Sequence, residues 1–332
     1  MTKAWKHELK NLITDIDVLW AQLALPVEFL PEAKKAAALF PLRITPSFLE
    51  RMQKGDIHDP LLKQVVPWHL ELAAQPADFI SDALAEKDAN KIPGLLHKYY
   101  GRVLLMLSGA CAINCRYCFR RNFPYEDNTP GSTGVSKMLE YIQNDPSISE
   151  VILSGGDPLM LPDEVLANLI LPLNDIKHVK TLRIHTRIPV VLPSRINENF
   201  LKLMQQSRLH KVIVMHVSHA QELDNAVFNA LKKLRPHAHL LNQSVLLKGI
   251  NDNADTLIAL SNKLFDYGVL PYYLHLLDKE NHTAHFEVAL EQAQLIIWDM
   301  MQKLPGYLVP KLAREIPGLG CKWVYGLMAM PH

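Results

Sequence analysis

The sequence predicts an α/β fold, an incomplete (βα)6 barrel that follows a helical N-terminal subdomain. The 332 residues are 48% hydrophobic, which is enough for a large buried core. From residue 102 onward, short apolar runs of β-forming residues alternate with amphipathic helical segments. Six such repeats in succession indicate a parallel sheet with crossover helices. In such barrels the chemistry takes place at the C-terminal ends of the strands.

The expected elements follow one another in a regular order. Residues 1–95 show helical stretches broken by prolines and no strand alternation, and Thr45 with Pro46 marks one helix start. The expected strands are Val103–Leu107, Val151–Leu153, Thr181–His185, Lys211–Val217, Leu241–Leu247 and Tyr272–Leu276. The expected helices between them are Ser136–Asn144, Pro162–Leu171, Glu198–Gln206, Gln221–Leu234 and Ala254–Tyr267. We therefore expect a helical subdomain over 1–95, the barrel over 96–285 and a C-terminal segment over 286–332.

Charge and hydropathy exclude several classes of protein. The 35 Lys and Arg residues nearly balance the 34 Asp and Glu residues, so no overall field marks the chain for nucleic acid or a membrane. The N-terminus places charges where a signal peptide needs an apolar run. No stretch reaches the roughly 18 apolar residues that span a bilayer. We expect a cytoplasmic protein.

Three of the four cysteines form a C-x3-C-x2-C cluster directly after the first expected barrel strand: Cys111, Cys115 and Cys118. Three thiolates on one tight loop can bind three corners of a [4Fe–4S] cubane and leave one iron open. The amino and carboxyl groups of S-adenosylmethionine (SAM) can chelate that iron. A zinc knuckle usually has four ligands, and no fourth is spaced to match. Three unpaired core cysteines are the other alternative, and we interpret the remaining Cys321 as structural.

A second motif, Gly155-Gly156-Asp157, stands at the end of the next expected strand. Paired glycines let the backbone approach a ligand closely, and the aspartate can accept a hydrogen bond from an ammonium group. Alone, this tripeptide indicates only a turn. Placed after a three-cysteine loop, it resembles the motif with which radical SAM enzymes hold the amino group of SAM.

Several further stretches resemble the lysine 2,3-aminomutase family of radical SAM enzymes. In that family the third cysteine is followed by an Arg-Arg pair, as Cys118 is here by Arg120 and Arg121. The other similar stretches are Arg43–Pro46, Asp59–Pro67, Arg183–Arg195, Asn242–Asp252 and Pro271–Asp278. The resemblance covers nearly the whole chain from about residue 40.

This resemblance implies pyridoxal 5′-phosphate (PLP) as a further cofactor. In the family, the lysine that binds PLP covalently follows a glycine-rich turn near the C-terminus, and the matching residue is Lys322. Gly318 and Gly320 would let the chain turn there, although the turn is poorer in glycine than is usual for the family. Arg102 resembles the arginine that binds the PLP phosphate.

The resemblance also implies the residues that bind substrate and cofactor. Arg120 resembles the arginine that pairs with the substrate α-carboxylate, for which a planar fork is suited. Asp278 resembles an acid that holds the substrate ε-ammonium group. Glu315 stands where the family has a second aspartate, and it is one methylene longer. Gln243 and His216 stand at strand ends where the family contacts cofactors, although histidines at such places are often satisfied within the core.

The implied activity is a 1,2-amino shift that converts L-lysine to (R)-β-lysine and needs an external one-electron reductant. The stretches Tyr307–Ile316 and His275–Lys279 look most like a bacterial branch that supplies β-lysine for translation elongation factor P, together with a lysyl-ligase. A catabolic or osmolyte-producing lysine 2,3-aminomutase, or a glutamate enzyme, is the alternative within the family. Asp278 argues against a glutamate side chain. The sequence leaves open whether the protein forms a homo-oligomer.

Two other classes of protein also stay open. A radical SAM enzyme without PLP could act on a macromolecule, as methylthiotransferases and maturases do, but these often carry extra cysteines or an RNA-binding domain. A non-enzymatic iron–sulfur or zinc module would leave the Gly155-Gly156-Asp157 turn unexplained.

Overall fold

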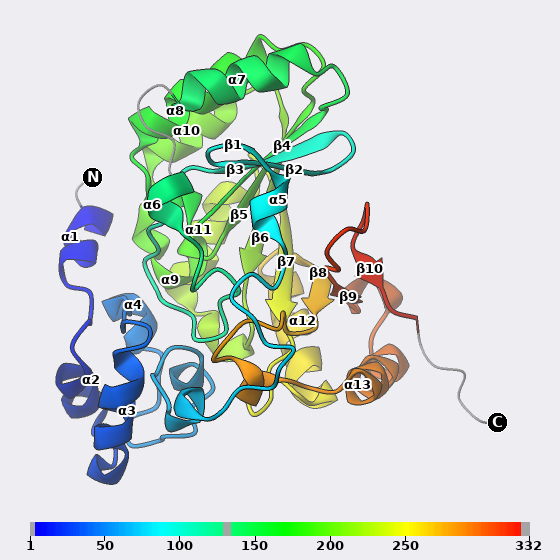
Figure 1. Cartoon of the computed structure of the whole chain (residues 1–332). Helices are drawn as coiled ribbons and strands as arrows, with labels where there is room; N and C mark the ends of the chain where they lie inside the picture. Colours follow the sequence, from blue (N-terminus) through cyan, green and yellow to red (C-terminus); the bar gives the residue numbers. More distant parts are fainter. Residues whose placement is uncertain (1–3, 129–133, 327–332) are drawn as a thin grey trace.

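Figure 1 shows the computed structural model of the chain, which describes residues 4–128 and 134–326. The described residues form one ten-stranded sheet in which the strands stand in sequence order, β1 to β10. Each of the expected barrel strands is confirmed to within two residues. They are β3 (Arg102–Met106), β4 (Glu150–Ser154), β5 (Thr181–Thr186), β6 (His210–His216), β7 (His239–Val245) and β8 (Leu270–His275). Each pairs in parallel with the next, so the α/β fold of an incomplete barrel is confirmed.

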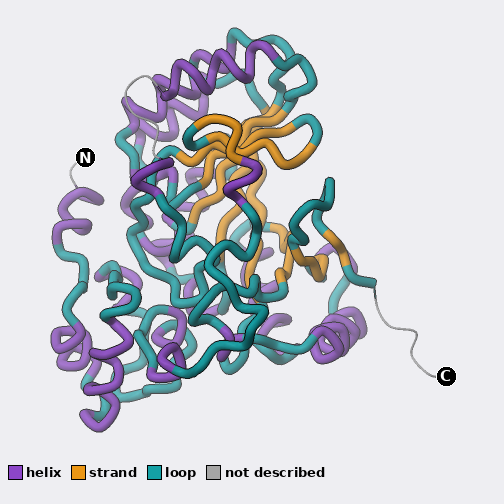
Figure 2. The backbone as a smooth tube through the Cα atoms, viewed as in Figure 1, coloured by secondary structure: helices purple, strands orange, loops and turns teal. Residues whose placement is uncertain are grey.

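The expected crossover helices are also present, and Figure 2 shows the strands gathered in the middle with helices around them. They are α7 (Gly134–Asn144), α8 (Asp163–Ile170), α10 (Glu198–Gln206), α11 (Asn225–Leu234) and α12 (Ala254–Asp266). Asn197, Asp224 and Asn253 begin the last three, because each side chain accepts a backbone N–H of the first turn. The apolar faces of these helices are buried, as at Val227 and Leu231 of α11.

Four strands were not expected from the sequence. β1 (Asn90–Ile92) and β2 (Leu95–Tyr99) form an antiparallel hairpin that pairs with β3. β9 (Lys311–Arg314) pairs in parallel with β8, and the short β10 (Trp323–Val324) returns along β9. These strands are short and carry polar residues, so they lack the apolar runs that marked the others. The hairpin crosses the boundary we expected at residue 96, and the three-part division remains a prediction.

The remaining elements cover the barrel at its two sides. In Figure 1 the N-terminal helices α1 to α4 lie together in blue, and α13 lies beside β9 and β10 at the opposite side. The remaining helices are α1 (Ala4–Lys10), α2 (Ile16–Leu23), α3 (Leu30–Ala37), α4 (Pro46–Leu49), α5 (Glu86–Ala89), α6 (Tyr125–Asn128), α9 (Ile188–Val191) and α13 (Leu290–Lys303). One apolar core runs from Trp5 to Leu312 and joins both sides to the barrel. None of the helices among the described residues combines the length and the apolar character needed to cross a membrane.

A buried ion-pair cluster fastens the N-terminal segment to the cysteine loop. Glu71, in the 3-10 helix His69–Leu72, is fully buried. Its carboxylate accepts hydrogen bonds from Arg116 Nε at 2.7 Å, Arg116 Nη2 at 2.6 Å and Arg121 Nη2 at 2.9 Å. Both arginines belong to the loop that carries the cysteines, so the packing of the N-terminal segment helps to set the position of that loop.

Replacing Glu71 with alanine leaves two buried guanidinium groups without their carboxylate. We expect the free energy of unfolding to fall by about 3–5 kcal/mol, because a buried charge that loses its partner is poorly solvated. Asp17→Asn, which breaks the exposed pair with Lys34, is the matched control and should change stability by about 1 kcal/mol or less. Thermal melts of the two variants test this, and equal melting temperatures would contradict it.

Candidate active site

A cavity of about 380 Å³ lies within the barrel and extends from Arg102, at the start of β3, to the C-terminal ends of the strands. Every site residue expected from the sequence lines it. These residues are Cys111, Cys115, Cys118, Arg102, Arg120, Gly155, Gly156, Asp157, His216, Gln243, Asp278, Glu315 and Lys322. The structure thus brings together residues that are up to 220 positions apart in the chain, and their individual roles remain predictions.

The cysteine loop follows β3 and is held by backbone hydrogen bonds to the N-terminal segment. Burial, together with the nearby Cys115, raises the pKa of Cys118 to about 12. Burial and the neighbouring Cys118 likewise raise the pKa of Cys111 well above its ordinary value. In the part of the chain that the structure describes, no group of three or more His, Cys, Asp or Glu side chains is arranged to hold a single metal ion. A cubane makes a different demand, because each thiolate binds its own iron at a separate corner.

The Gly155-Gly156 turn lies directly against the start of the cysteine loop. Gly156 N donates to Ser108 O at 2.7 Å, and Asp157 N donates to Ala110 O at 2.9 Å. A Cβ atom on Gly156 would stand 2.5 Å from Ala110 O, and Gly155 has a φ of +116°. Glycine is therefore required at both positions if the two loops are to touch.

Asp157 joins the ends of β4 and β5. Its carboxylate accepts hydrogen bonds from Thr186 Oγ1 at 2.7 Å and from Arg187 N at 2.7 Å. Burial raises the pKa of Asp157 to about 6, although these hydrogen bonds act in the opposite direction. Much of its hydrogen-bonding capacity is therefore used inside the protein, and the binding of a ligand ammonium by Asp157 remains a prediction.

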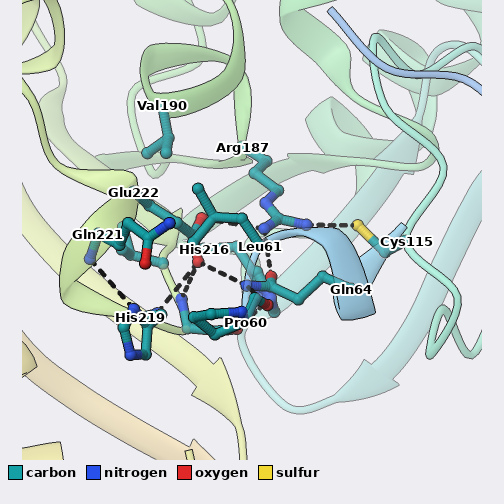
Figure 3. A network of polar contacts seen from close by, with 12 residues as sticks. Pro60, Leu61, Gln64, Cys115, Arg187, Val190, His216, His219, Gln221 and Glu222 are labelled. Carbon is teal, nitrogen blue, oxygen red and sulfur yellow. Dashed lines mark hydrogen bonds and ion pairs between the residues drawn. The ribbon is translucent and has the colours of Figure 1, made fainter. Parts of the chain in front are cut away.

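Arg187, which the sequence analysis did not single out, connects the cysteine loop to a buried polar network (Figure 3). Arg187 Nη1 lies 2.8 Å from Cys115 Sγ. Arg187 Nη2 donates to Gln64 Oε1 at 2.5 Å and to Glu222 Oε2 at 2.9 Å. These two acceptors hold the guanidinium so that its other nitrogen reaches the sulfur. A single arginine after a strand gave no signal of this contact, because its partners are distant in the sequence.

His216 and Gln243 occupy neighbouring strand ends at the wall of the cavity. His216 Nε2 makes hydrogen bonds with Tyr117 Oη at 2.8 Å and Ser218 Oγ at 3.2 Å. Burial lowers the pKa of His216 to about 3, so the ring is neutral at physiological pH. The histidine is therefore already satisfied by protein groups while its ring lines the cavity.

A row of opposite charges forms another wall. Arg120 is paired with Glu86, Lys98 Nζ lies 2.9 Å from Glu315 Oε1, and Lys322 Nζ lies 3.3 Å from Glu315 Oε2. The sequence analysis missed Glu86 and Lys98, which look like ordinary charged residues of a polar segment. Glu86 and Lys98 connect Arg120, the predicted carboxylate-binding residue, to Glu315, a predicted ammonium-binding residue.

The two acids in this wall have opposite pKa shifts. Burial, together with the neighbouring Glu315, raises the pKa of Asp278 to about 7. Burial alone would also raise the pKa of Glu315, but the cations of Lys322 and Lys98 lower it to about 2. Glu315 is thus ionised, while Asp278 is half-protonated near neutral pH and can gain full charge when a cation arrives.

Three buried nitrogen atoms of residues that line the cavity have no hydrogen-bond partner among the described residues: Arg102 Nε, His185 Nε2 and Arg187 Nε. Such unsatisfied groups are rare in folded proteins and suit a polar ligand. Arg102 stacks on Tyr99 with its guanidinium carbon 4.8 Å from the ring centre, so its charge is fixed at the wall. A phosphate beside Arg102, with Lys322 in the same cavity, fits the residues present.

The family model of the radical SAM superfamily matches residues 105–259, which span the cysteine loop and most of the barrel. Cavity, fold and match together define the chain as a radical SAM protein. It is 47% identical over 322 residues to the L-lysine 2,3-aminomutase of Haemophilus influenzae, covering 97% of this chain and 95% of that relative. The Escherichia coli relative of the same description is 47% identical, with coverage of 95% and 92%. That of Clostridium subterminale is 34% identical, with coverage of 96% and 76%.

The chain belongs to the lysine 2,3-aminomutase family, whose members are radical SAM isomerases. Membership implies a [4Fe–4S] cluster, SAM and PLP as cofactors. The resemblance inferred from the motifs is confirmed.

Replacing Arg187 with glutamine should lower both stability and iron retention. Buried Glu222 loses its cation, which we expect to cost about 3–5 kcal/mol, and Cys115 Sγ loses its donor. Arg195→Gln is the matched control, because Arg195 is fully buried and paired with Asp163 away from the cysteines. Melting temperature and iron content after anaerobic reconstitution are measured for both. If the two variants retain the same amount of iron, the contact with Cys115 has no part in cluster binding.

Proposed function

We propose that this enzyme is a PLP-dependent lysine 2,3-aminomutase that forms (R)-β-lysine from L-lysine in the cytoplasm, for the β-lysylation of translation elongation factor P. The observation that carries the proposal is one cavity lined both by the three cysteines and by Lys322, Arg120 and the acids. The relatives named above are described as L-lysine 2,3-aminomutases. An external one-electron reductant is part of the proposal.

The residues of the chain would position the reactants. Arg120 would bind the substrate carboxylate, while Asp278 and Glu315 would bind its ε-ammonium group. Lys322 and Arg102 would hold PLP, and the three cysteines would hold the cluster. When bound, these groups and SAM supply a 5′-deoxyadenosyl radical and a ring system that delocalises the unpaired electron. Fixing both ends of lysine determines which hydrogen faces the radical.

Part of the cavity wall is apolar, which suits radical chemistry because apolar side chains leave no room for water where they stand. Ile113, Val191 and Leu277 line it and are buried. Because thiols and phenols also line the cavity, the substrate must be held closer to the radical than those groups are.

The link to elongation factor P is supported by the segments Tyr307–Ile316 and His275–Lys279, which look most like that branch of the family. These segments contribute Asp278 and Glu315 to the cavity. A catabolic or osmolyte-producing lysine 2,3-aminomutase has the same chemistry and is the alternative. A PLP-free enzyme that acts on a macromolecule would leave the Lys322 side of the cavity without a role.

An anaerobic assay of the reconstituted protein with SAM, PLP, dithionite and L-lysine tests the reaction. We expect β-lysine, identified by chiral chromatography, and its loss by at least a thousandfold in Cys115→Ala and, separately, in Lys322→Ala. SAM cleavage without any change to lysine would retain the radical SAM class and exclude the aminomutase. Addition of elongation factor P and its ligase then tests the use of the product.

Lysine binding should release a proton through Asp278. Its pKa is raised to about 7 by burial and by Glu315, and an ammonium group beside it would lower that value, because opposite charge favours the carboxylate. Below pH 7 the bound proton must leave, so we expect lysine to bind roughly fivefold more tightly at pH 7 than at pH 6. Calorimetry in buffers of different ionisation enthalpy, without reductant, measures the proton release. Asp278→Asn should abolish this component, and an unchanged release would contradict the assignment.

A further inference from the structure

The hydrogen bonds of Arg120 show that one side of its guanidinium is already occupied. Arg120 Nε and Nη2 each lie 2.7 Å from a different oxygen of Glu86, which makes a bidentate pair. Arg120 Nη1 donates to Ser154 Oγ at 3.1 Å and to Gly155 O at 3.3 Å. A guanidinium group has five N–H donors. Within the described residues these contacts use at most four of them, and the second N–H of Nη2 is left for a ligand.

The position of Glu86 makes it a strong anchor for this arginine. Its side chain is buried, and it begins α5, where its backbone N–H donates to Asp82 Oδ1 at 3.0 Å. Arg120 is itself buried, so without a carboxylate at this point its charge would be poorly solvated. Unlike Ser154 and Gly155, Glu86 is an ionised acceptor and binds Arg120 through two parallel hydrogen bonds, which restrict the rotation of a long side chain.

The pair does not neutralise this end of the cavity. Lys98 Nζ lies 3.8 Å from Glu86 Oε1, so the single carboxylate of Glu86 stands between two cations. Lys98 also pairs with Glu315, which in turn pairs with Lys322, so the three cations Arg120, Lys98 and Lys322 outnumber the carboxylates of Glu86 and Glu315 and leave a formal charge of +1. A cavity wall with this excess can accept one further carboxylate, such as that of an amino acid.

We propose that Glu86 is a positioning residue for substrate recognition: it fixes Arg120 by its Nε side and directs the free N–H toward the α-carboxylate of lysine. This inference rests on the proposed function and adds a specificity determinant to it. Glu86 itself does not touch the substrate. The recognition of a carboxylate in the barrel then depends on a segment that precedes the β1–β2 hairpin.

The test compares L-lysine with 1,5-diaminopentane, which is lysine without its carboxylate. Dissociation constants are measured by calorimetry with the reconstituted holoenzyme in the absence of reductant, so that no turnover occurs. In Glu86→Gln we expect lysine to bind about ten- to a hundredfold more weakly, because a charge-assisted contact is lost behind Arg120. The dissociation constant of the diamine should change by less than about threefold. The variant should therefore prefer lysine over the diamine less strongly than the unmodified enzyme does.

Two further variants keep the test decisive. Glu86→Asp retains the charge on a shorter side chain, so its lysine affinity should lie between those of the unmodified enzyme and Glu86→Gln. It replaces Glu86→Gln if that variant does not fold. Asp163→Asn removes the partner of buried Arg195 outside the cavity, so it should lower the melting temperature and leave the lysine-to-diamine ratio unchanged.

Three outcomes would overturn the inference. Equal losses for both ligands in Glu86→Gln would show a merely structural role, and an unchanged lysine affinity would show no role. Tighter lysine binding would show that Glu86 occupies the carboxylate site and must be displaced. If the unmodified holoenzyme neither binds nor converts lysine, the proposed function itself fails. If it converts lysine but Glu86→Gln has the same ratio of lysine to diamine dissociation constants, only the role of Glu86 is excluded.

Discussion

The site depends on buried arginines that are each paired with a carboxylate from another part of the chain. Arg116 pairs with Glu71, Arg120 with Glu86, and Arg187 with Glu222. A buried ion pair gives little net stability, but the loss of one partner is costly, so these pairs fix which segments must lie together. They join the N-terminal segment, the cysteine loop and the ends of β5 and β6 into one rigid wall. The position of the cysteines therefore depends on residues far outside their motif.

The cavity has two regions that differ in the kind of side chain that lines them. The cysteines, the glycine turn and Arg187 form one region, where backbone and thiol groups stand close together. Arg120, Lys98, Glu315 and Lys322 form another, where charges alternate. Under the proposed function, a radical formed in the first region would meet lysine while the second region holds its charged groups. The raised pKa of Asp278 suits this arrangement, because a proton on Asp278 avoids a second full negative charge beside Glu315.

The sequence was sufficient for the parallel strands β3 to β8 and for the motif residues of the cavity, because apolar runs and motifs are local signals. It was not sufficient for β1, β2, β9 and β10, which are short and polar, nor for the side-chain partners. Glu86 lies 34 residues from Arg120, and Arg187 lies 72 residues from Cys115. A single charged residue in a polar segment resembles a solvated surface group until the fold buries it. Asp157 was expected to face a ligand, and only the structure shows how many protein donors surround it.

The central claim is that three cysteines alone hold a four-iron cluster with one iron open to SAM. Electron paramagnetic resonance of the anaerobically reconstituted, reduced protein tests it most directly, with spectra recorded before and after SAM is added. We predict a [4Fe–4S] signal that changes with SAM, that is lost in the alanine variants of Cys111, Cys115 and Cys118, and that is retained in Cys321→Ala. A signal that needs Cys321, or that SAM leaves unchanged, would contradict the account.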